Sequence, residues 1–275
     1  MKKLEGKVAY VTGSGRGIGQ AIALKLAADG ARLVLNDIDE APAKETIAKI
    51  EALGSKAVAC VGDVTAPDFG TRYIKTGLDA FGRIDIIVNN AGYPWDSVLQ
   101  KVTDEQWYAM LDVHATAPMR ILRAATDFIR DAAKKEREAG QAFNRKVVFI
   151  SSIGGVCGNA GQIAYAAGKT AIIGMTKTMA KEWGRFGVNV NCVAFGFIQT
   201  RMTQPLGDQA IVSKIGSREV KMGIKPEMIA AMTATIPLGR PGTPEDAANA
   251  VYLFCIPESD YISGEVMLAS GGLVI

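Results

Sequence analysis

The chain has 275 residues, of which 48% are hydrophobic and 21% are charged, and its formal net charge at pH 7 is +3. This composition excludes a disordered chain and favours one large α/β domain that spans residues 1–275. Basic and acidic residues are interspersed along the chain, which argues against a nucleic-acid-binding surface.

No stretch is apolar for long enough to cross a membrane, and the N-terminal MKKLEGKVAY lacks the apolar core of a signal peptide. We therefore expect a cytoplasmic protein. The cysteines stand far apart and have no histidine cluster beside them, so we expect reduced thiols and no metal site. They are Cys60, Cys157, Cys192 and Cys255.

The first strand is predicted at 7–11, and the glycine-rich stretch TGSGRGIG follows at 12–19. A helical pattern, AIALKLAADG, comes next. Gly13, Gly17 and Gly19 permit a tight turn and a close approach of the backbone, so that a pyrophosphate can rest on the helix N-terminus. This strand, turn and helix predict a dinucleotide-binding site.

The second strand, at 32–36, ends at Asp37, about twenty residues past the glycine turn. A carboxylate at this place accepts hydrogen bonds from an adenosine ribose and repels a 2′-phosphate. Because Ile38 rather than an arginine follows it, we expect NAD(H) to be preferred over NADP(H). Arg16 in the glycine turn is an argument for the 2′-phosphate of NADP(H) instead. The alternative role for Asp37 is that of a turn residue in the NDID cluster, without a ligand.

Helices predicted at 40–53 and 68–81 alternate with strands at 56–61 and 84–88. This rhythm predicts a doubly wound parallel sheet whose ligands bind beyond the carboxyl ends of the strands. The stretch NNAG closes the fourth strand at that edge, where a cofactor would pass.

Thr103 and Gln106 form a capping-box pattern that opens a long helix ending near Gly140, and Pro118 is expected to kink this helix. Strands at 188–193 and 265–269 complete the sheet. Between them, the methionine-rich stretch at about 197–236 is expected to be irregular. Such a segment is typical of a mobile cover over a substrate site.

The apolar run at 147–150 predicts a strand buried on both faces, and it ends at Ser151 and Ser152. Tyr165 and Lys169 lie four residues apart in helix-forming sequence, so both project from one face. A phenol has a pKa of about 10, and lowering it by roughly 3 units requires about 4 kcal/mol. We expect the Lys169 ammonium to supply this, so that Tyr165 transfers a proton while Ser152 holds a substrate oxygen. An accidental surface pair is the alternative.

Taken together, TGSGRGIG, NNAG, the thirteen-residue step from Ser152 to Tyr165, and YAAGK resemble the short-chain dehydrogenase/reductase family over nearly the whole chain. The resemblance implies one Rossmann-type sheet of about seven parallel strands with helices on both faces. It also implies that Tyr165 is the acid/base, that Ser152 positions the substrate, and that Lys169 binds the nicotinamide ribose. The NAD site would be lined, besides Tyr165 and Lys169, by Gly13, Arg16, Gly17, Ile18, Gly19, Asp37, Asp63, Val64, Asn90, Ala91, Gly92, Ile198 and Thr200.

Two positions depart from the family pattern. The family places an asparagine in the long helix as a fourth catalytic member, joining the lysine to solvent through water, and this chain has His114 there. Imidazole also donates, accepts and relays protons, so we expect a relay, with a packing histidine as the alternative. Phe195 stands where the family has a proline before Gly196, and we expect it to reshape the nicotinamide pocket.

These observations predict an NAD(H)-dependent oxidoreductase that interconverts a secondary alcohol and a ketone by hydride transfer. The nearest analogies in the family are 3-oxoacyl-[acyl-carrier-protein] reductases and hydroxyacyl-CoA dehydrogenases, so a 3-oxoacyl thioester is the expected small-molecule substrate. A steroid, a sugar or another cyclic alcohol is the alternative substrate, because fold and motif do not specify it. A nucleotide sensor without catalysis is a further alternative. The resemblance also implies a homotetramer, with the helices of Asp104 and Tyr165 buried between subunits.

Overall fold

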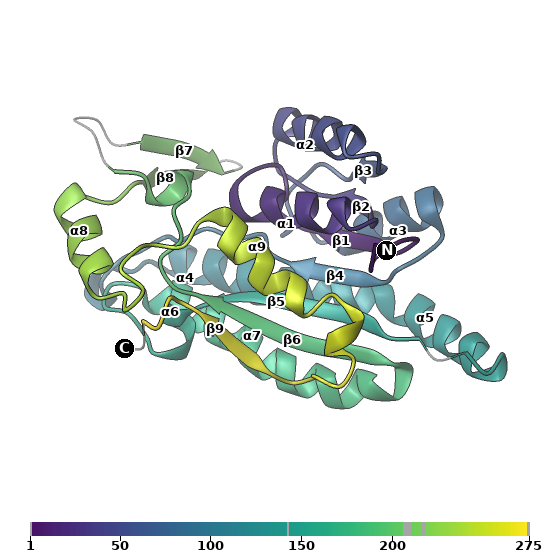
Figure 1. The fold of residues 1–275 in the computed structure, drawn as a ribbon. Helices are drawn as coiled ribbons and strands as arrows, with labels where there is room; N and C mark the ends of the chain where they lie inside the picture. Colours follow the sequence, from purple (N-terminus) through teal and green to yellow (C-terminus); the bar gives the residue numbers. More distant parts are fainter. Residues whose placement is uncertain (1, 142, 206–210, 216–217, 274–275) are drawn as a thin grey trace.

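Seven parallel strands form one sheet, as the sequence predicts (Figure 1). The computed structural model describes residues 2–141, 143–205, 211–215 and 218–273, with the backbone alone at 211–215 and 218–222. The sheet has the order β3-β2-β1-β4-β5-β6-β9. The strands are β1 Val8–Val11, β2 Arg32–Leu35, β3 Ala57–Ala59, β4 Ile86–Asn89, β5 Arg145–Ser152, β6 Val188–Phe195 and β9 Val266–Ala269.

The strand order reverses between β1 and β4. The chain builds outward from β1 to β3, returns to place β4 beside β1, and then builds outward in the other direction. Val11 of β1 lies opposite Val88 of β4 in this pairing. In a doubly wound sheet, ligands bind in the crevice beyond the carboxyl ends of the strands at this reversal. The fold therefore places a ligand site after Val11 and Val88.

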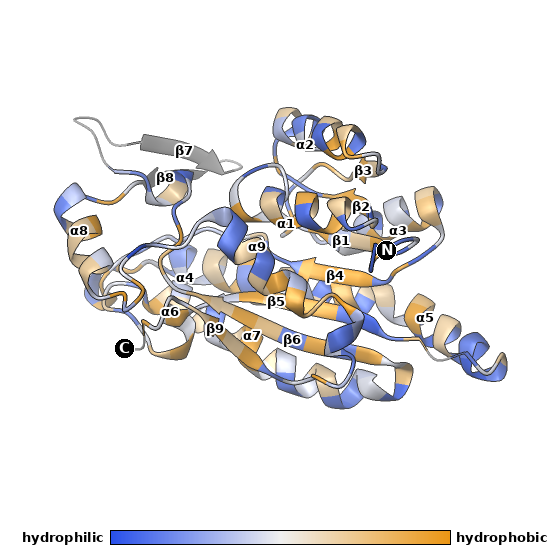
Figure 2. Cartoon of the chain, in the orientation of Figure 1, coloured by the Kyte–Doolittle hydropathy of each residue, from blue (hydrophilic) through white to orange (hydrophobic). Residues whose placement is uncertain are grey.

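Helices cover both faces of the sheet, and the alternation of side chains along β1 shows why (Figures 1 and 2). Val8 and Tyr10 belong to one apolar core, while Ala9 and Val11 belong to the other. The second core contains α1 Gly17–Ala28, α2 Glu40–Ala52 and α9 Pro244–Leu253. The first core contains α3 Phe69–Phe81, α4 Asp104–Leu111, α5 Ala117–Glu138 and α7 Ile163–Trp183.

The long helix predicted from Asp104, with a kink at Pro118, is interrupted shortly before that proline. After α4, the chain widens into a π-helical turn, Asp112–Thr116, in which the Ala117 N–H bonds to the Asp112 carbonyl. This turn ends at Thr116, two residues before Pro118, which lacks an N–H and whose ring would clash with a regular preceding turn. The interruption carries His114, so the proline sets the backbone from which that side chain projects.

The stretch at 197–236 is more regular than predicted. It contains a two-stranded antiparallel hairpin, β7 Ile211–Ile215 and β8 Arg218–Met222, and the helix α8 Pro226–Ala234 (Figure 1, upper left). The signals were present in the sequence, because Pro226 occupies the first helical turn and Glu227 follows it. Residues 206–210 and 216–217 of the predicted cover lie outside the described residues.

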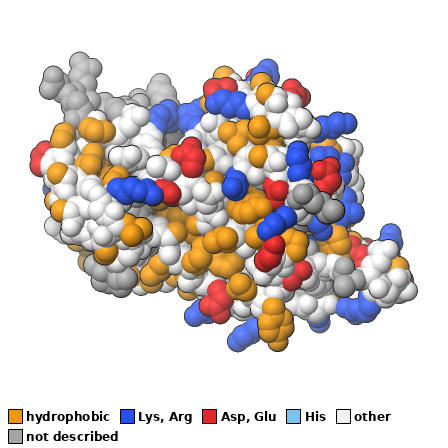
Figure 3. Space-filling view, viewed as in Figure 1, with side chains coloured by type: hydrophobic (Ala, Val, Ile, Leu, Met, Phe, Trp, Pro, Cys, Tyr) orange, Lys and Arg blue, Asp and Glu red, His pale blue; other side chains and the backbone are white. Residues whose placement is uncertain are grey.

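The surface shows no segregation of charge on the face drawn in Figure 3. Lysine and arginine side chains lie among aspartate and glutamate side chains there, with apolar side chains between them. Among the described helices, none combines the length and the apolar character that a membrane span requires.

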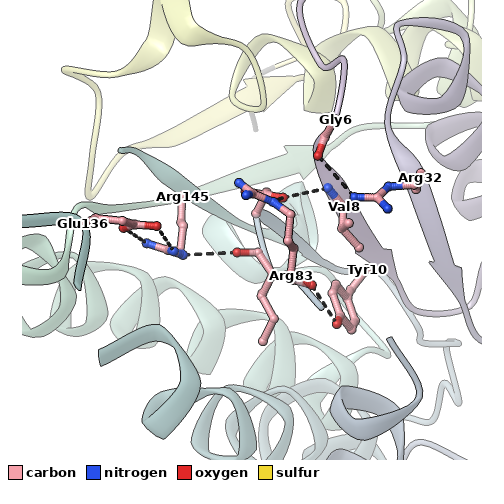
Figure 4. A network of polar contacts seen from close by, with 9 residues as sticks. Gly6, Val8, Tyr10, Arg32, Arg83, Glu136 and Arg145 are labelled. Atoms are coloured by element: carbon pink, nitrogen blue, oxygen red, sulfur yellow. Dashed lines mark hydrogen bonds and ion pairs between the residues drawn. The ribbon is translucent and has the colours of Figure 1, made fainter. Parts of the chain in front are cut away.

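Buried charges hold the amino ends of the central strands together (Figure 4). The Asp85 carboxylate, 2% exposed, accepts hydrogen bonds from the Val8 N–H at 2.8 Å and from the Arg83 guanidinium at 2.9 Å. Arg145 at the start of β5 makes a two-pronged ion pair with Glu136 of α5, at 2.7 and 2.9 Å. Each buried charge is therefore paired, as a low-dielectric environment requires.

Replacing Asp85 with alanine is expected to lower the free energy of unfolding by about 2 kcal/mol, because the buried Val8 N–H loses its acceptor. Urea denaturation measures this. Asp79→Ala is the matched control, since the ion pair of Asp79 with Lys75 is exposed and contributes about 0.5 kcal/mol or less. Equal losses in the two variants would show that the buried carboxylate has no special structural role.

Candidate active site

The glycine turn after β1 is bound to the end of β4 at the point where the strand order reverses. The Thr12 hydroxyl accepts hydrogen bonds from the backbone N–H groups of Asn90 and Ala91, both at 3.0 Å. The Asn90 side chain donates in return to the carbonyls of Thr12 at 2.9 Å and Gly13 at 3.1 Å. The turn and the NNAG stretch therefore form one rigid wall of the crevice.

Glycines allow the turn to close. Gly13 and Gly17 have φ of +61° and +56°, a region that other residues rarely adopt. A side chain at Gly19 would collide with the Gly13 carbonyl, whereas one at Gly17 would meet no atom within 4 Å. The start of α1 thus borders open space, and its N-cap residue Arg16 makes no side-chain capping bond among the described residues. This uncapped N-terminus fits an anionic phosphate group.

Asp37 lies at the end of β2 as predicted, and it is already hydrogen-bonded within the protein. One carboxylate oxygen accepts from the Gly15 N–H at 3.0 Å and the other from the Asp39 N–H at 3.1 Å. The tight approach depends on Gly15, because a Cβ there would lie 2.5 Å from the carboxylate. Arg16 pairs with Asp39 at 2.7 Å. The residue that favoured a 2′-phosphate is therefore partly neutralised by an acid.

The remaining predicted cofactor residues follow the ends of other strands at the same edge. Asp63 and Val64 lie after β3, where the Asp63 carboxylate accepts from the backbone and the hydroxyl of Thr65, both at 2.8 Å. Ile198 and Thr200 lie after β6, and Ile198 forms an isolated parallel bridge with Gly242. The predicted cofactor residues thus follow five strand ends at one edge of the parallel sheet.

Ser152, Tyr165 and Lys169 are brought together by tight packing between β5 and α7. The Lys169 ammonium donates to the Ile150 carbonyl at 2.8 Å, and the Ser151 hydroxyl donates to the Lys169 carbonyl at 2.9 Å. The Ser152 hydroxyl oxygen accepts from the Gly154 N–H at 3.1 Å, in the short helix α6 Ile153–Val156. A hydroxyl that accepts at its oxygen can still donate its own proton, to Tyr165 in this state or to a substrate oxygen.

Burial, and not the lysine, dominates the proton affinity of the phenol. It raises the pKa of Tyr165 to about 12, against which a hydrogen bond with Ser152 acts. Burial also lowers the pKa of Lys169 to about 8. The Lys169 ammonium lies 5.7 Å from the centre of the Tyr165 ring. Desolvation of the phenolate therefore has the largest effect on the Tyr165 pKa in this state of the protein, and the lowering by Lys169 that the sequence predicts is not seen in it.

His114 lies against Tyr165, with ring centres 5.2 Å apart and planes nearly perpendicular. It is 1% exposed, and its Nε2 lies 3.1 Å from the Tyr93 carbonyl, to which it must donate. Nδ1 is then an acceptor, and it has no partner among the described residues. Burial and the nearby Lys169 charge hold the pKa of His114 well below its usual range. The ring is accommodated because Gly92 and Gly168 carry no side chains.

Phe195 is the last residue of β6 and is 5% exposed. It pairs with Ser152 on one side and Ala269 on the other. A proline at this position has no N–H for the ladder. The phenylalanine therefore allows β6 to continue to the level of Ser152. The sequence did not predict this extension of the strand.

Some residues that build the site were not identified from the sequence. Thr12 and Asn36 carry the hydrogen bonds that link the glycine turn to β4 and β2. Asp96 and Gln162 form a further polar pair beside Tyr165, with 2.7 Å between the amide and the carboxylate. Thr12 and Gly15 were visible as the first residue and the second glycine of the TGSGRGIG motif. Nothing in the spacing of Asn36, Asp96 and Gln162 indicates a site.

A hydroxyl, a phenol and an ammonium beside an uncapped helix N-terminus are the groups that carbonyl reduction with a dinucleotide requires. Fold and site therefore define a dinucleotide-dependent oxidoreductase. Residues 7–211 match the family model of the short chain dehydrogenases. The chain belongs to the short-chain dehydrogenase family, and so interconverts CH–OH groups and ketones with a nicotinamide cofactor.

Curated relatives cover the whole chain. It is 37% identical over 270 residues to a 3-oxoacyl-[acyl-carrier-protein] reductase of Vibrio cholerae, covering 98% of both chains. It is 35% identical over 273 residues to a reductase of the same name from Thermotoga maritima, covering 99% of this chain and 100% of the other. A crystal structure described as a short-chain alcohol dehydrogenase from Sinorhizobium meliloti superimposes with a TM-score of 0.84 at 27% identity, covering 98% and 97% of the chains.

Lys169 gives the site a measurable pH signature. Its pKa of about 8 in the folded protein lies below its unfolded value of about 10.4, so the unfolded state binds more protons between these two pH values. Stability relative to Lys169→Met is therefore expected to rise by about 3 kcal/mol as pH increases from about 8 to about 10.4. Urea denaturation of both proteins across this range measures it, and a constant difference would contradict a lowered pKa.

Proposed function

We propose that the protein is an NAD(H)-dependent 3-oxoacyl thioester reductase, or 3-hydroxyacyl dehydrogenase in the reverse direction, acting on acyl-carrier-protein or CoA thioesters. The observation that carries the reaction type is the packing of Ser152, Tyr165 and Lys169 at the carboxyl end of β5. The substrate class is supported by identity over the full chain to relatives named as 3-oxoacyl-[acyl-carrier-protein] reductases.

The chemistry follows from the protonation states of these groups. Tyr165, with a pKa of about 12, is a neutral phenol at pH 7 and enters ketone reduction as the proton donor. The Ser152 proton holds the substrate oxygen beside it, and the nicotinamide cofactor supplies the hydride when bound. Lys169, with a pKa of about 8, is mostly cationic at pH 7 and stabilises negative charge as the phenol proton leaves.

A panel of ketones tests the substrate class. We expect kcat/KM with an S-acetoacetyl thioester to exceed that with cyclic ketones and sugar-derived ketones by at least about tenfold, measured as NADH oxidation. Tyr165→Phe should lower thioester reduction by about 10²- to 10⁴-fold. A preference for cyclic ketones would support the steroid or sugar alternative, and no turnover of any ketone would support a nucleotide sensor.

The NAD(H) preference rests on Asp37. A buried carboxylate at the end of β2, 7% exposed, would have to lie beside a 2′-phosphate dianion. Arg16, which would attract that phosphate, is paired with Asp39. Both observations support NAD(H) over NADP(H).

Removing the Asp37 charge is expected to shift the ratio of kcat/KM for NADH over NADPH by about 10- to 100-fold towards NADPH. Asp37→Ala also removes the acceptors for the Gly15 and Asp39 N–H groups, so Asp37→Asn is the closer variant, because it removes the charge and retains one of the two acceptors. Steady-state kinetics with both cofactors measures the ratio. If wild type prefers NADPH, or if both variants keep its ratio, the proposed preference is wrong.

His114 is proposed to act as a permanently neutral imidazole. Its Nε2–H is committed to the Tyr93 carbonyl, and its Nδ1 offers a buried acceptor beside Tyr165 and Lys169. A relay in which Nδ1 holds a water needs only this acceptor. An amide in the same place supplies an acceptor too, which supports a role shared with the asparagine of the family pattern.

His114→Ala is expected to lower kcat about tenfold or more while the Kd for NADH stays within about twofold. His114→Asn should recover most of the loss. The pKa of His114 is held well below its usual range. The pH–rate profiles of wild type and His114→Asn should therefore have the same shape near pH 6.5. Full activity of a folded alanine variant would make this histidine a packing residue.

A homotetramer is proposed from the family resemblance. A surface groove between α5 and α7 is lined by Met119, Leu122, Met175 and Met179. Apolar side chains on two neighbouring helices support a subunit contact there.

A further inference from the structure

Asp96 and Gln162 join two loops beside the catalytic groups. The Gln162 side-chain amide donates to the Asp96 carboxylate at 2.7 Å, and the Asn159 amide donates to the Gln162 side-chain oxygen at 3.0 Å. The backbone makes the same connection, because the Ser97 N–H donates to the Gly161 carbonyl at 2.8 Å. Gln162 is also the N-cap residue of α7, three positions before Tyr165.

The charge of Asp96 and the hydrogen bond from Asn159 fix the orientation of the Gln162 amide. An ionised carboxylate only accepts hydrogen bonds, so the NH₂ group of Gln162 must face it. The amide oxygen then faces the opposite way. Gly154 lies between these groups. A Cβ atom added to Gly154 would lie 3.2 Å from this amide oxygen, 3.6 Å from the Ser152 hydroxyl oxygen and 3.8 Å from a ring carbon of Tyr165. The amide oxygen therefore borders the space in which Ser152 and Tyr165 meet a substrate.

We propose that Asp96 is a specificity-determining residue that disfavours substrates carrying a carboxylate next to the reacting ketone, and so selects neutral esters and thioesters of 3-oxo acids. It does so through its own negative charge and through the Gln162 amide oxygen, which Asp96 and Asn159 together hold beside Ser152 and Tyr165. The inference rests on the proposed function, since it names what distinguishes a 3-oxoacyl thioester from the free acid.

The chemistry of the substrates makes this discrimination possible. In a 3-oxo acid, one methylene separates the ketone from the carboxylate, so an anion is brought close to Tyr165 whenever the ketone is bound. The Asp96 charge already acts at that place, because it opposes formation of the Tyr165 phenolate and contributes to its raised pKa. The same repulsion opposes a substrate carboxylate beside Tyr165. An ester or thioester carries no such charge.

The test compares acetoacetate with ethyl acetoacetate, which differ in the charge of the carboxyl group. For each enzyme, kcat/KM of the acid divided by that of the ester is measured by NADH oxidation. Asp96→Asn is expected to raise this ratio about tenfold, equivalent to about 1.4 kcal/mol. Where turnover of the acid is too slow to measure, its inhibition constant against ester reduction gives the same comparison.

Asp79→Asn is the matched control, because it changes the net charge equally and lies on α3, in an exposed ion pair with Lys75. Its ratio should equal that of wild type. Raising the ionic strength should also raise the wild-type ratio towards that of Asp96→Asn, and this readout needs no variant. A ratio within twofold of wild type in folded Asp96→Asn, or a wild-type ratio unaffected by salt, overturns the proposal. Failure of wild type to reduce any 3-oxo ester or thioester would instead refute the proposed function.

Discussion

The close packing of α7 against the end of β5 is the constraint on which the active site depends. Gly155 has no side chain where α7 passes, and a Cβ there would lie 2.6 Å from that of Lys169. Lys169 can then reach the Ile150 carbonyl, and Ser151 can reach back to the helix. Since Tyr165 lies one turn before Lys169, the same contact holds the phenol at the level of Ser152. Hydroxyl, phenol and ammonium are thus positioned by one interface.

Burial has the same effect on the ionisable groups at this interface. It disfavours the charged forms of Tyr165, Lys169 and His114. The pKa of Tyr165 is therefore raised, and the pKa values of Lys169 and His114 are lowered. A neutral phenol is ready to donate a proton. The resting site is therefore suited to ketone reduction, and alcohol oxidation requires a further source of stabilisation for the phenolate.

The two edges of the sheet carry different kinds of polar group. At the amino edge, Asp85 and Arg145 have charged partners or backbone partners that satisfy them fully, which stabilises the fold. At the carboxyl edge, the side chain of Asn89 and His114 Nδ1 have no hydrogen-bond partner among the described residues, whereas Arg32 Nε is such an atom at the amino end of β2. Unsatisfied polar groups are costly when buried, so the three at the carboxyl edge mark a place where a ligand would complete the structure.

Much of the fold was predictable from local pattern. Each of the seven strands was located from an apolar run, and the glycine turn and its helix were recognisable together, because backbone conformation and side-chain periodicity are local properties. The failures were local too. The hairpin and α8 were not predicted, because methionines scattered through this stretch obscure the alternation along the hairpin strands and the helix-start signal at Pro226.

The sequence by itself determined the sheet, and it predicted the dinucleotide site at the end of β1 and the catalytic set of Ser152, Tyr165 and Lys169. Only the tertiary structure decided how these groups ionise, since the pKa of Tyr165 depends on desolvation by residues distant in the chain. It also decided that Asn90 is hydrogen-bonded to Thr12, which joins the glycine turn to the end of β4. It likewise decided that Gln162 is hydrogen-bonded to Asp96, 66 positions away in the chain. Such contacts have no signature in spacing, because they arise where two loops meet in space and not from the period of either segment.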